Sequence, residues 1–444
     1  HTFTTPPLSR QDLRVLRSPS AICSRPPGYG RSMAPEEDSP TSRFASLASP
    51  TYRKLWWGGS FIFLAMQVQM VARGWLAYEL IGTNTALGGV LIGFGVATLI
   101  AIPTGGVIAD RFNKRTILVL CQIANTITAL AIAVAITGGV IAYWMIVAAS
   151  VAGGASLSLL APARMAMTAE IVNRSLLTNA IMLSTLSIQT TRIIGPAVAG
   201  LLIALDGFGA EGVYYLSALL SAISIPLTLR LPKGAPTGAL HTGPLEDMFA
   251  GFRYVRDRAE LTRLLLMSVV VVVFGFAHTA FLPTFVEDIF ERGPADLGFI
   301  MTAAAVGAVI VSATLANAGR TKLASYQARS AVGMGVMLLL FAVMPNWWGA
   351  LVVMVVLGGA MSAFQSLNSA LVLSIADMEY HGRVQSLIMY SYSAFGLAAL
   401  PFGILADRVG LRETLIAMAV VVLIATAVFD RWRHSIASQQ IDAL

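Results

Sequence analysis

The ionisable side chains inside the long apolar runs of this 444-residue sequence include Arg192, Arg73 and His278. Charge is costly at such places and marks a functional site by default. Arg192 lies about 16 residues into the run 176–205, a depth of about 24 Å at 1.5 Å per residue, so we expect it to face a cavity. There it would hold an anionic substrate group or set the charge of a proton site. Arg73 lies near the end of the run 55–80. Its long side chain could face a cavity or, equally, extend to water at the membrane surface. An unperturbed histidine titrates near neutral pH, which makes His278 a candidate proton carrier, although a lone histidine in an apolar helix is also a common packing residue.

Uncharged amides at similar depth either contact a substrate or hydrogen-bond a neighbouring helix, and both interpretations stay open. The candidate cavity residues are therefore Gln67, Gln69, Arg73, Gln189, His278, Gln365 and Asn368. No Asp or Glu lies deep in a run, whereas a buried carboxylate is the usual proton carrier in membrane proteins that move protons. Proton carriage would fall to His278 or to an acid at the rim, unless the protein is uncoupled; the rim acids are Glu79, Glu170, Asp206 and Asp377.

Motifs for catalysis, metals and nucleotides are missing from the sequence. The five histidines are scattered, and Cys23 and Cys121 are the only cysteines, so no metal-ligand cluster and no disulfide is expected. Neither HExxH nor GxSxG occurs, which argues against an enzyme, and no GxxxxGK[ST] loop occurs, which excludes an ATP-driven pump for this chain alone. We expect no cofactor and no metal.

The composition indicates that the segments carrying these residues lie in a membrane. The chain is 56% hydrophobic and 12% charged, whereas soluble domains are about 45–50% apolar and about 25% charged. The net charge of +7 is spread over short loops rather than gathered in a patch. This distribution is typical of a protein that faces an anionic membrane surface and argues against nucleic acid as a partner.

Twelve apolar runs are each long enough to span a bilayer as a helix of about 20 residues. The runs are 55–80, 86–108, 116–137, 140–163, 176–205, 211–230, 264–288, 295–317, 323–344, 347–375, 384–406 and 411–430. They are continuous rather than alternating, which predicts an all-α membrane protein and excludes a β-barrel. Lys and Arg concentrate in loops on one side, so we expect a multi-pass protein of the cell membrane with both termini cytoplasmic. Arg408 and Arg412 do not fit this pattern.

The two halves repeat each other at a shift of about 205 residues: Gly153-Gly154 corresponds to Gly358-Gly359 and Pro196 to Pro401. Such a repeat predicts two pseudo-symmetric six-helix bundles with a cavity between them. The expected domains are a disordered extension (1–50), an N-terminal bundle (51–230), a cytoplasmic linker with an amphipathic helix (231–262), a C-terminal bundle (263–430) and a cytoplasmic tail (431–444). The Arg-rich stretch 1–32 has two readings, a transit peptide or a gene-model artefact ahead of Met33.

Two segments give a resemblance to a known family. The stretch GGVIADRFNKRTIL fits the loop between helices 2 and 3 of the major facilitator superfamily at Gly106, Asp110, Arg111 and Arg115, with Asn113 in place of an inner glycine. RIIGPAVAG, at 192–200, is similar to the Gly-Pro motif of helix 5 in its antiporters. Together with APARMAMTAEIVNRSLLTNA and GFRYVRDR, these segments resemble the branch of the enterobactin exporter and related drug exporters.

The resemblance implies roles for both segments. In this family the helix 2–3 loop is a conformational latch, here comprising Gly106, Asp110, Arg111, Asn113 and Arg115. Asp110 is expected to meet a helix N-terminus of the other half, near Gly382-Arg383, because such ends carry positive charge. Arg111 and Arg115 are expected to pair with Glu170 or Asp377. The alternative is that these basic residues only fix the topology.

The helix 5 motif comprises Arg192, Gly195, Pro196 and Gly200. Its proline leaves a carbonyl unpaired and bends the helix. We expect it to shape a gate or a cavity wall, or to provide a packing kink without a directional role.

The sequence therefore predicts a secondary transporter, working as a monomer in the lipid bilayer. Its expected function is proton-driven export of small amphipathic molecules, of drug or siderophore type, by alternating access. A non-transporting membrane scaffold or sensor and an uncoupled facilitator are the alternatives.

Overall fold

The computed structural model describes residues 44–234, 244–315 and 323–442, except for the side chains of 103–107, 109–111, 244–248, 392 and 433–442. All regular elements in these ranges are helical, and twelve of them are long and apolar enough to cross a membrane. The prediction of an all-α membrane protein with two six-helix bundles is confirmed.

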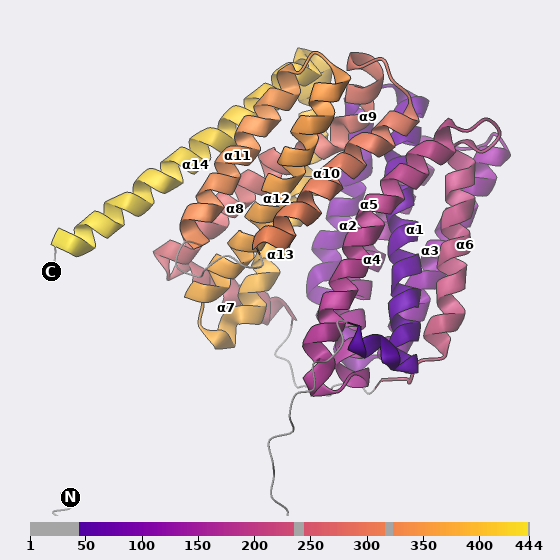
Figure 1. Cartoon of the computed structure of the whole chain (residues 1–444), viewed down its shortest axis with the longest axis horizontal. Coiled ribbons are helices and arrows are strands. Elements are labelled where there is room, and N and C mark those ends of the chain that lie inside the picture. The colour runs from indigo at the N-terminus through magenta and orange to yellow at the C-terminus, as the bar shows by residue number, and fades with distance from the viewer. Residues whose placement is uncertain (1–43, 235–243, 316–322, 443–444) are drawn as a thin grey trace, which may run out of the picture. The chain divides into compact units, whose positions relative to one another are not determined.

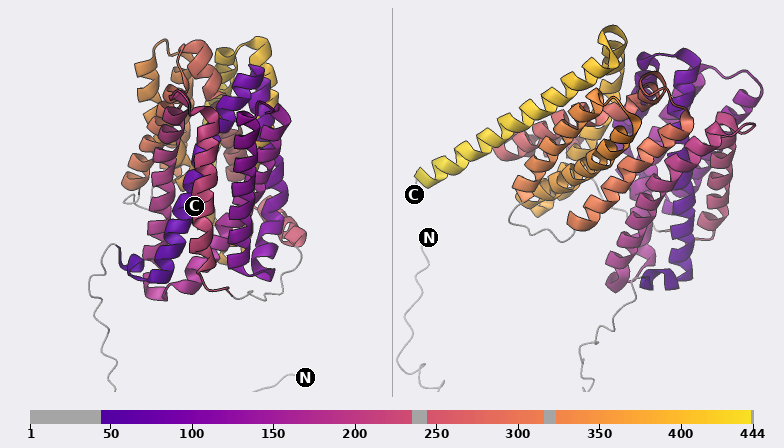
Figure 2. Two further views of the ribbon diagram at one scale, coloured as in Figure 1. Left: turned by 90° about the vertical axis from the view of Figure 1, so that its right-hand side faces the viewer. Right: turned by 45° about the horizontal axis from the view of Figure 1, so that its top comes forward.

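Each half contains six spans. The N-terminal half holds α1 (Pro50–Ile81), α2 (Asn84–Arg111), α3 (Lys114–Thr137), α4 (Tyr143–Ile171), α5 (Leu177–Ala204) and α6 (Gly209–Leu229). The C-terminal half holds a broken first span, α8 (Ala259–Phe276) with η4 (Ala277–Phe281), α9 (Leu282–Thr284) and η5 (Phe285–Ile289), and then α10 (Pro294–Leu315), α11 (Leu323–Val343), α12 (Trp347–Ile375), α13 (His381–Val409) and α14 (Leu411–Asp442). The two halves are the indigo-to-magenta and orange-to-yellow groups of helices in Figures 1 and 2.

Helix pairing repeats from one half to the other, as the sequence repeat predicts. In the N-terminal half α2 packs on α4, α3 on α6, and α1 on α5 and α6. The same pairs recur as α10 with α12, α11 with α14, and α8 with α13 and α14. Gly154 lets α4 approach the Phe94 carbonyl of α2, and Gly358 lets α12 approach the backbone of Ala304 in α10. Small residues therefore bring the backbones together at equivalent places, as membrane interfaces favour.

Local sequence sets the helix boundaries. The Ser49 side chain accepts a bond from the Tyr52 amide before Pro50, and the Thr83 side chain accepts one from the Ala86 amide, so each caps a helix N-terminus. Gly82 ends α1 with φ of +69°, a left-handed conformation that glycine adopts without strain.

The first span of the C-terminal half is interrupted, although the sequence predicts a continuous helix over 264–288. Pro283 has no N–H to donate into the preceding turn, and Ala277–Phe281 adopts a tighter 3-10 geometry ahead of it. A mid-helix 3-10 stretch often marks a functional hinge. This break contributes side chains to both cavities described below.

Two expected boundaries differ from the structure. Ala45–Ala48, expected in the N-terminal extension, forms a short helix (η2) that joins the N-terminal half, because the Ser46 amide donates to Asn179 Oδ1 at 3.1 Å. The expected tail from residue 431 continues the last helix to Asp442. The linker contains the expected helix as α7 (Pro244–Arg256), which contacts α13 and α2. Residues 1–43, including the stretch 1–32, lie outside the described part.

The two halves meet mainly through α2 with α13 and α5 with α10. A Cβ built on Gly88 would lie 2.5 Å from the Ala399 carbonyl oxygen, and one on Gly200 would lie 2.8 Å from the Gly298 Cα. These contacts gather at one end of the bundle, where α2 and α10 begin and α5 and α13 end; we call it the Asn84 end. The opposite end, where α2 finishes, is the Phe112 end.

Candidate functional site

Two cavities lie between the halves. The first, the Arg73 cavity, has a volume of about 200 Å³ and is lined from α1, α2, α3, α4, the helix break, α10 and α13. The second, the Arg192 cavity, has a volume of about 170 Å³ and is lined from α1, α5, the helix break, α10 and α12. Four residues line both cavities and so separate them: Gln67, Met70, Thr279 and Met301. Two of the four are methionines, whose flexible side chains adapt to different neighbours.

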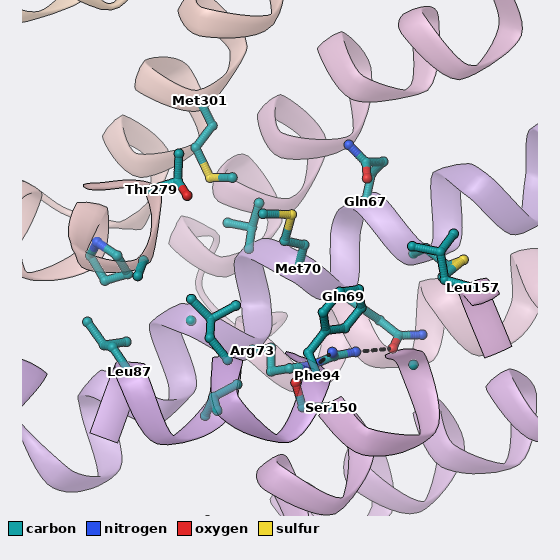
Figure 3. A pocket seen from close by; sticks show the side chains of 18 of the residues that line it. Gln67, Gln69, Met70, Arg73, Leu87, Phe94, Ser150, Leu157, Thr279 and Met301 are labelled. Carbon is teal, nitrogen blue, oxygen red and sulfur yellow. Dashed lines mark hydrogen bonds between the residues drawn. The ribbon is translucent and has the colours of Figure 1, made fainter. Parts of the chain in front are cut away.

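Arg73 lies in the wall of the first cavity (Figure 3). One terminal nitrogen donates to Ser150 Oγ at 3.3 Å and the other to Gln69 Oε1 at 3.1 Å. Its Nε is buried and has no hydrogen-bond partner in the described residues. The guanidinium passes over Gly153, where a Cβ would lie 3.3 Å from it. Of the two interpretations of Arg73, the structure therefore supports the cavity position.

A buried amide network holds the Arg73 partner in place. Gln69 Nε2 donates to Ser217 Oγ at 2.5 Å and to Asn125 Oδ1 at 3.3 Å, and Asn125 in turn donates to Ser221 Oγ at 2.8 Å. The Gln69 amide thus presents its oxygen to Arg73 because its nitrogen is engaged by α3 and α6. The network fixes the direction of the guanidinium before any ligand arrives.

His278 occupies the helix break and lines the second cavity. Its Nδ1 lies 2.8 Å from the Gly275 carbonyl oxygen, which only accepts, so Nδ1 carries the proton in the neutral ring. Nε2 is buried and has no hydrogen-bond partner among the described residues. The ring therefore keeps one basic nitrogen without a protein donor.

The structure brings most of the predicted cavity residues together. Those that line the Arg192 cavity are Gln67, Gln189, Arg192, His278 and Gln365. Those that line the Arg73 cavity are Gln67, Gln69 and Arg73. Asn368 lines neither: it bonds Gln327 and Ser268 at 2.9 and 3.0 Å inside the C-terminal half.

The helix 5 motif shapes contacts with two neighbours. Gly195 lets α5 approach α1, because a Cβ there would lie 2.5 Å from the Gln67 Cβ. Pro196 and Gly200 face Gly298 of the other half. Arg192, three residues before Gly195, lines the second cavity. The motif therefore joins a cavity wall to the closure at the Asn84 end.

The predicted latch is described only in part, since the side chains of Gly106, Asp110 and Arg111 lie outside the described residues. Asn113 has φ of −59° and ψ of 121°. This backbone has a negative φ and does not require glycine, so asparagine fits there without strain.

The basic residues that follow pair differently from expectation. Arg115 donates to the carbonyls of Leu229 and Leu231 at 3.3 and 3.0 Å, instead of pairing with an acid. Lys114 takes Glu170 as its ion-pair partner, and Arg258 takes Asp377.

Comparison with known proteins decides the family. The pattern of the transmembrane secretion effector family, a family of the major facilitator superfamily, matches residues 41–442. The chain belongs to this family. It is 24% identical over 395 residues to the staphyloferrin A transporter of Staphylococcus aureus, covering 85% of this chain and 95% of that protein. It is 28% identical over 300 residues to the enterobactin exporter EntS of Shigella flexneri, covering 66% and 69%.

A solved structure confirms the architecture of this family member. A variant of the nucleoside transporter NupG superposes with a TM-score of 0.70 over 86% of this chain and 99% of that one, at 16% identity. The predicted superfamily and exporter branch are confirmed. The chain is a transporter of small molecules and not an enzyme.

Asp407 joins the two halves, and the sequence prediction missed it. It lies at the end of α13 in the stretch GILADRVGLRETL, and its carboxylate accepts four hydrogen bonds from the start of α2 in the other half. The donors are Asn84 N at 2.8 Å, Asn84 Nδ2 at 3.0 Å, Thr85 N at 2.8 Å and Thr85 Oγ1 at 2.5 Å. The halves are thus tied at the Asn84 end by a carboxylate on a helix N-terminus.

The signal for Asp407 was present in the sequence. Gly403, Asp407, Arg408 and Arg412 repeat the spacing of the predicted latch residues, Gly106, Asp110, Arg111 and Arg115. The arginines that did not fit the loop-charge pattern belong to this second copy. A motif comparison within the chain would have found it.

Arg164 was also missed, because it lies one residue beyond the predicted run 140–163. It lies within α4 and is 6% exposed, with its guanidinium 5.1 Å from the centre of the Phe63 ring. Its Nε and one terminal nitrogen have no hydrogen-bond partner in the described residues. Arg164 lines neither cavity.

Proposed function

We propose that this protein exports small amphipathic molecules of siderophore or drug type from the cytoplasm by alternating access, driven by protons. The observation that carries the proposal is the pair of cavities between two similar halves, tied together at one end. The names of the relatives support the substrate class, since one is an enterobactin exporter and another a staphyloferrin A transporter.

The charged loops support one orientation of the protein in the membrane. Lys and Arg concentrate at the Phe112 end, for example Lys114, Arg115 and Arg230, and cytoplasmic loops carry such an excess. The Phe112 end and both termini then lie in the cytoplasm. The Asn84 end, where the halves are tied, faces outward, so the described conformation is closed to the outside.

Two carboxylates at opposite ends give the proposal a symmetric gating scheme. Asp407 holds the outer end closed through the start of α2. Asp110 has the same sequence surroundings at the inner end, which supports the prediction that it closes that end in the alternate state. Each half-cycle breaks one carboxylate–helix contact and forms the other, and both groups are hydrated in between.

His278 is the proposed proton carrier. No acid lines either cavity among the described residues, whereas the Nε2 of neutral His278 carries a lone pair and has no hydrogen-bond partner among those residues. Proton uptake there when the cavity opens to the outside, and release toward the cytoplasm, would drive a substrate in the opposite direction.

An efflux assay tests the function. Bacteria without their own drug and siderophore exporters would express the chain, and loss of preloaded enterobactin, staphyloferrin A and fluorescent dyes would be measured. We expect faster loss than with empty vector, abolished by a protonophore. The Asp110→Ala variant should reach the membrane in equal amount and export more slowly.

The His278→Gln variant separates coupling from transport. In vesicles with a pH gradient it should still exchange substrate across the membrane but no longer concentrate it. If wild-type protein moves none of these compounds, or export is indifferent to the protonophore, the proposal of proton-driven export of this class is wrong.

A further inference from the structure

We propose that the substrate is an anion whose acidic group binds Arg73, with its apolar body spread across both cavities. This inference rests on the proposed transport function and names the charge of the molecule that the site accepts. A protein that handled organic cations would need the opposite charge at the same place.

The guanidinium of Arg73 is oriented but not neutralised. Its two terminal nitrogens donate to a hydroxyl and to an amide oxygen, both uncharged, and no carboxylate pairs with the guanidinium among the described residues. Arginine has five N–H donors in a planar fork that suits carboxylates and similar oxyanions. Arg73 is partly buried, and a charge held partly out of water without a counter-ion is unfavourable, so a bound anion relieves that cost.

The neighbours of Arg73 are arranged for this role. Gly153 leaves room for the guanidinium against α4, since any side chain there would meet it. Gln69 is held by α3 and α6, so its oxygen positions one edge of the fork (Figure 3). A side chain that only reached for water at the membrane surface would need neither feature.

The charge of the whole lining has one sign. Among the described lining residues the charged side chains are Arg73 in one cavity and Arg192 in the other, and neither cavity has a lining Asp or Glu. His278 adds a second positive charge beside Arg192 when it is protonated. A low-dielectric cavity with cationic groups on both sides favours anions and repels cations.

The rest of the lining fits an apolar body. Leu87, Leu91, Phe94, Leu157 and Phe395 surround Arg73 in the first cavity. The partition between the cavities is made partly of methionines, Met70 and Met301, which move aside without loss of buried polar contacts. A substrate larger than either cavity alone can thus extend from Arg73 toward Arg192.

A binding experiment on purified protein tests the inference without requiring transport. Two dyes share a xanthene ring system: carboxyfluorescein is anionic and rhodamine 6G is cationic. Binding of each to the protein in neutral detergent would be measured by fluorescence anisotropy. We expect saturable binding of carboxyfluorescein that is at least tenfold tighter than that of rhodamine 6G.

Three variants locate the effect. Arg73→Gln should weaken carboxyfluorescein binding at least tenfold and narrow the preference over rhodamine 6G, whereas Arg73→Lys should retain part of both. Arg329→Gln removes an equal charge from an exposed position on α11 and should change neither. Elution as a single folded species on size exclusion controls for misfolding.

The outcomes that overturn the inference are distinct from loss of function. Tighter binding of the cation, equal binding of carboxyfluorescein by Arg73→Gln, or no saturable carboxyfluorescein binding by wild-type protein would each refute it. A wild-type protein that exports rhodamine 6G in cells but binds no anion would keep the exporter proposal and reject this one.

Discussion

Replacing Asp407 by alanine should open the Asn84 end of the molecule. In the closed form the carboxylate accepts hydrogen bonds from the backbone amides of Asn84 and Thr85 and from the side chain of each of these residues. Those amides belong to the first turn of α2 and have no acceptor within the helix. When the end opens, water hydrates both partners, so the substitution removes stabilisation from the closed form alone.

The magnitude follows from comparable helix caps. Losing a capping side chain costs about 0.5–2 kcal/mol, and an anion at a helix N-terminus adds about 0.3–1 kcal/mol. Asp407 is exposed at the rim, so solvent screening places the loss near about 1.5 kcal/mol. This corresponds to about a tenfold fall in the ratio of closed to open protein. Asp407→Asn keeps one acceptor oxygen and should fall in between.

Distance measurements between spin labels check this prediction. Val140, in the loop between α3 and α4, and Trp348, in the first turn of α12, are exposed residues at the Asn84 end, one in each half. Spin labels at these positions in a background without cysteine report the opening of this end. The Asp407→Ala variant should gain a longer-distance population about tenfold above wild type. Glu413→Ala, which removes a nearby acid within the same half, should leave the distribution unchanged. Equal distributions for Asp407→Ala and Glu413→Ala would refute the latch.

Two further substitutions separate closure from stability. Gly298→Leu should prevent closure of the Asn84 end, because the absence of a side chain on Gly298 lets Pro196 and Gly200 of α5 approach it. The same spin labels should then show only the long distance, and transport should cease. Asn368→Leu should lower the free energy of unfolding by about 1–3 kcal/mol by leaving Gln327 and Ser268 without a buried partner. Thermal unfolding would show that loss while carboxyfluorescein affinity stays at the wild-type value, and a large loss of affinity would place Asn368 at the site after all.

Much of the architecture could be predicted because its causes are local. A run of about 20 apolar residues has few structures available in a bilayer other than a helix. The halves could be paired in advance because glycines and prolines repeat at a fixed shift. The break at Ala277–Phe281 was missed, since periodicity does not distinguish a helix from a helix interrupted by Pro283.

For the site, the sequence could predict how far along a helix each residue lies, but not which way its side chain faces. Depth along a helix placed Arg192 and His278 near the middle of the membrane, and both line a cavity. The direction in which a residue faces depends on which helices surround it. For that reason Asn368 proved to be a packing residue and Arg164 proved to be buried.

By itself, the sequence determined that the chain lies in a lipid bilayer, how often it crosses the bilayer and that its halves repeat. Hydrophobicity, length and spacing are properties of the chain that need no tertiary contact. Only the tertiary structure decided that Arg73 faces a cavity with uncharged partners and that Asp407 meets the start of α2. Asp407 and Asn84 are 323 residues apart, and a contact over that distance exists only once the two halves have packed together.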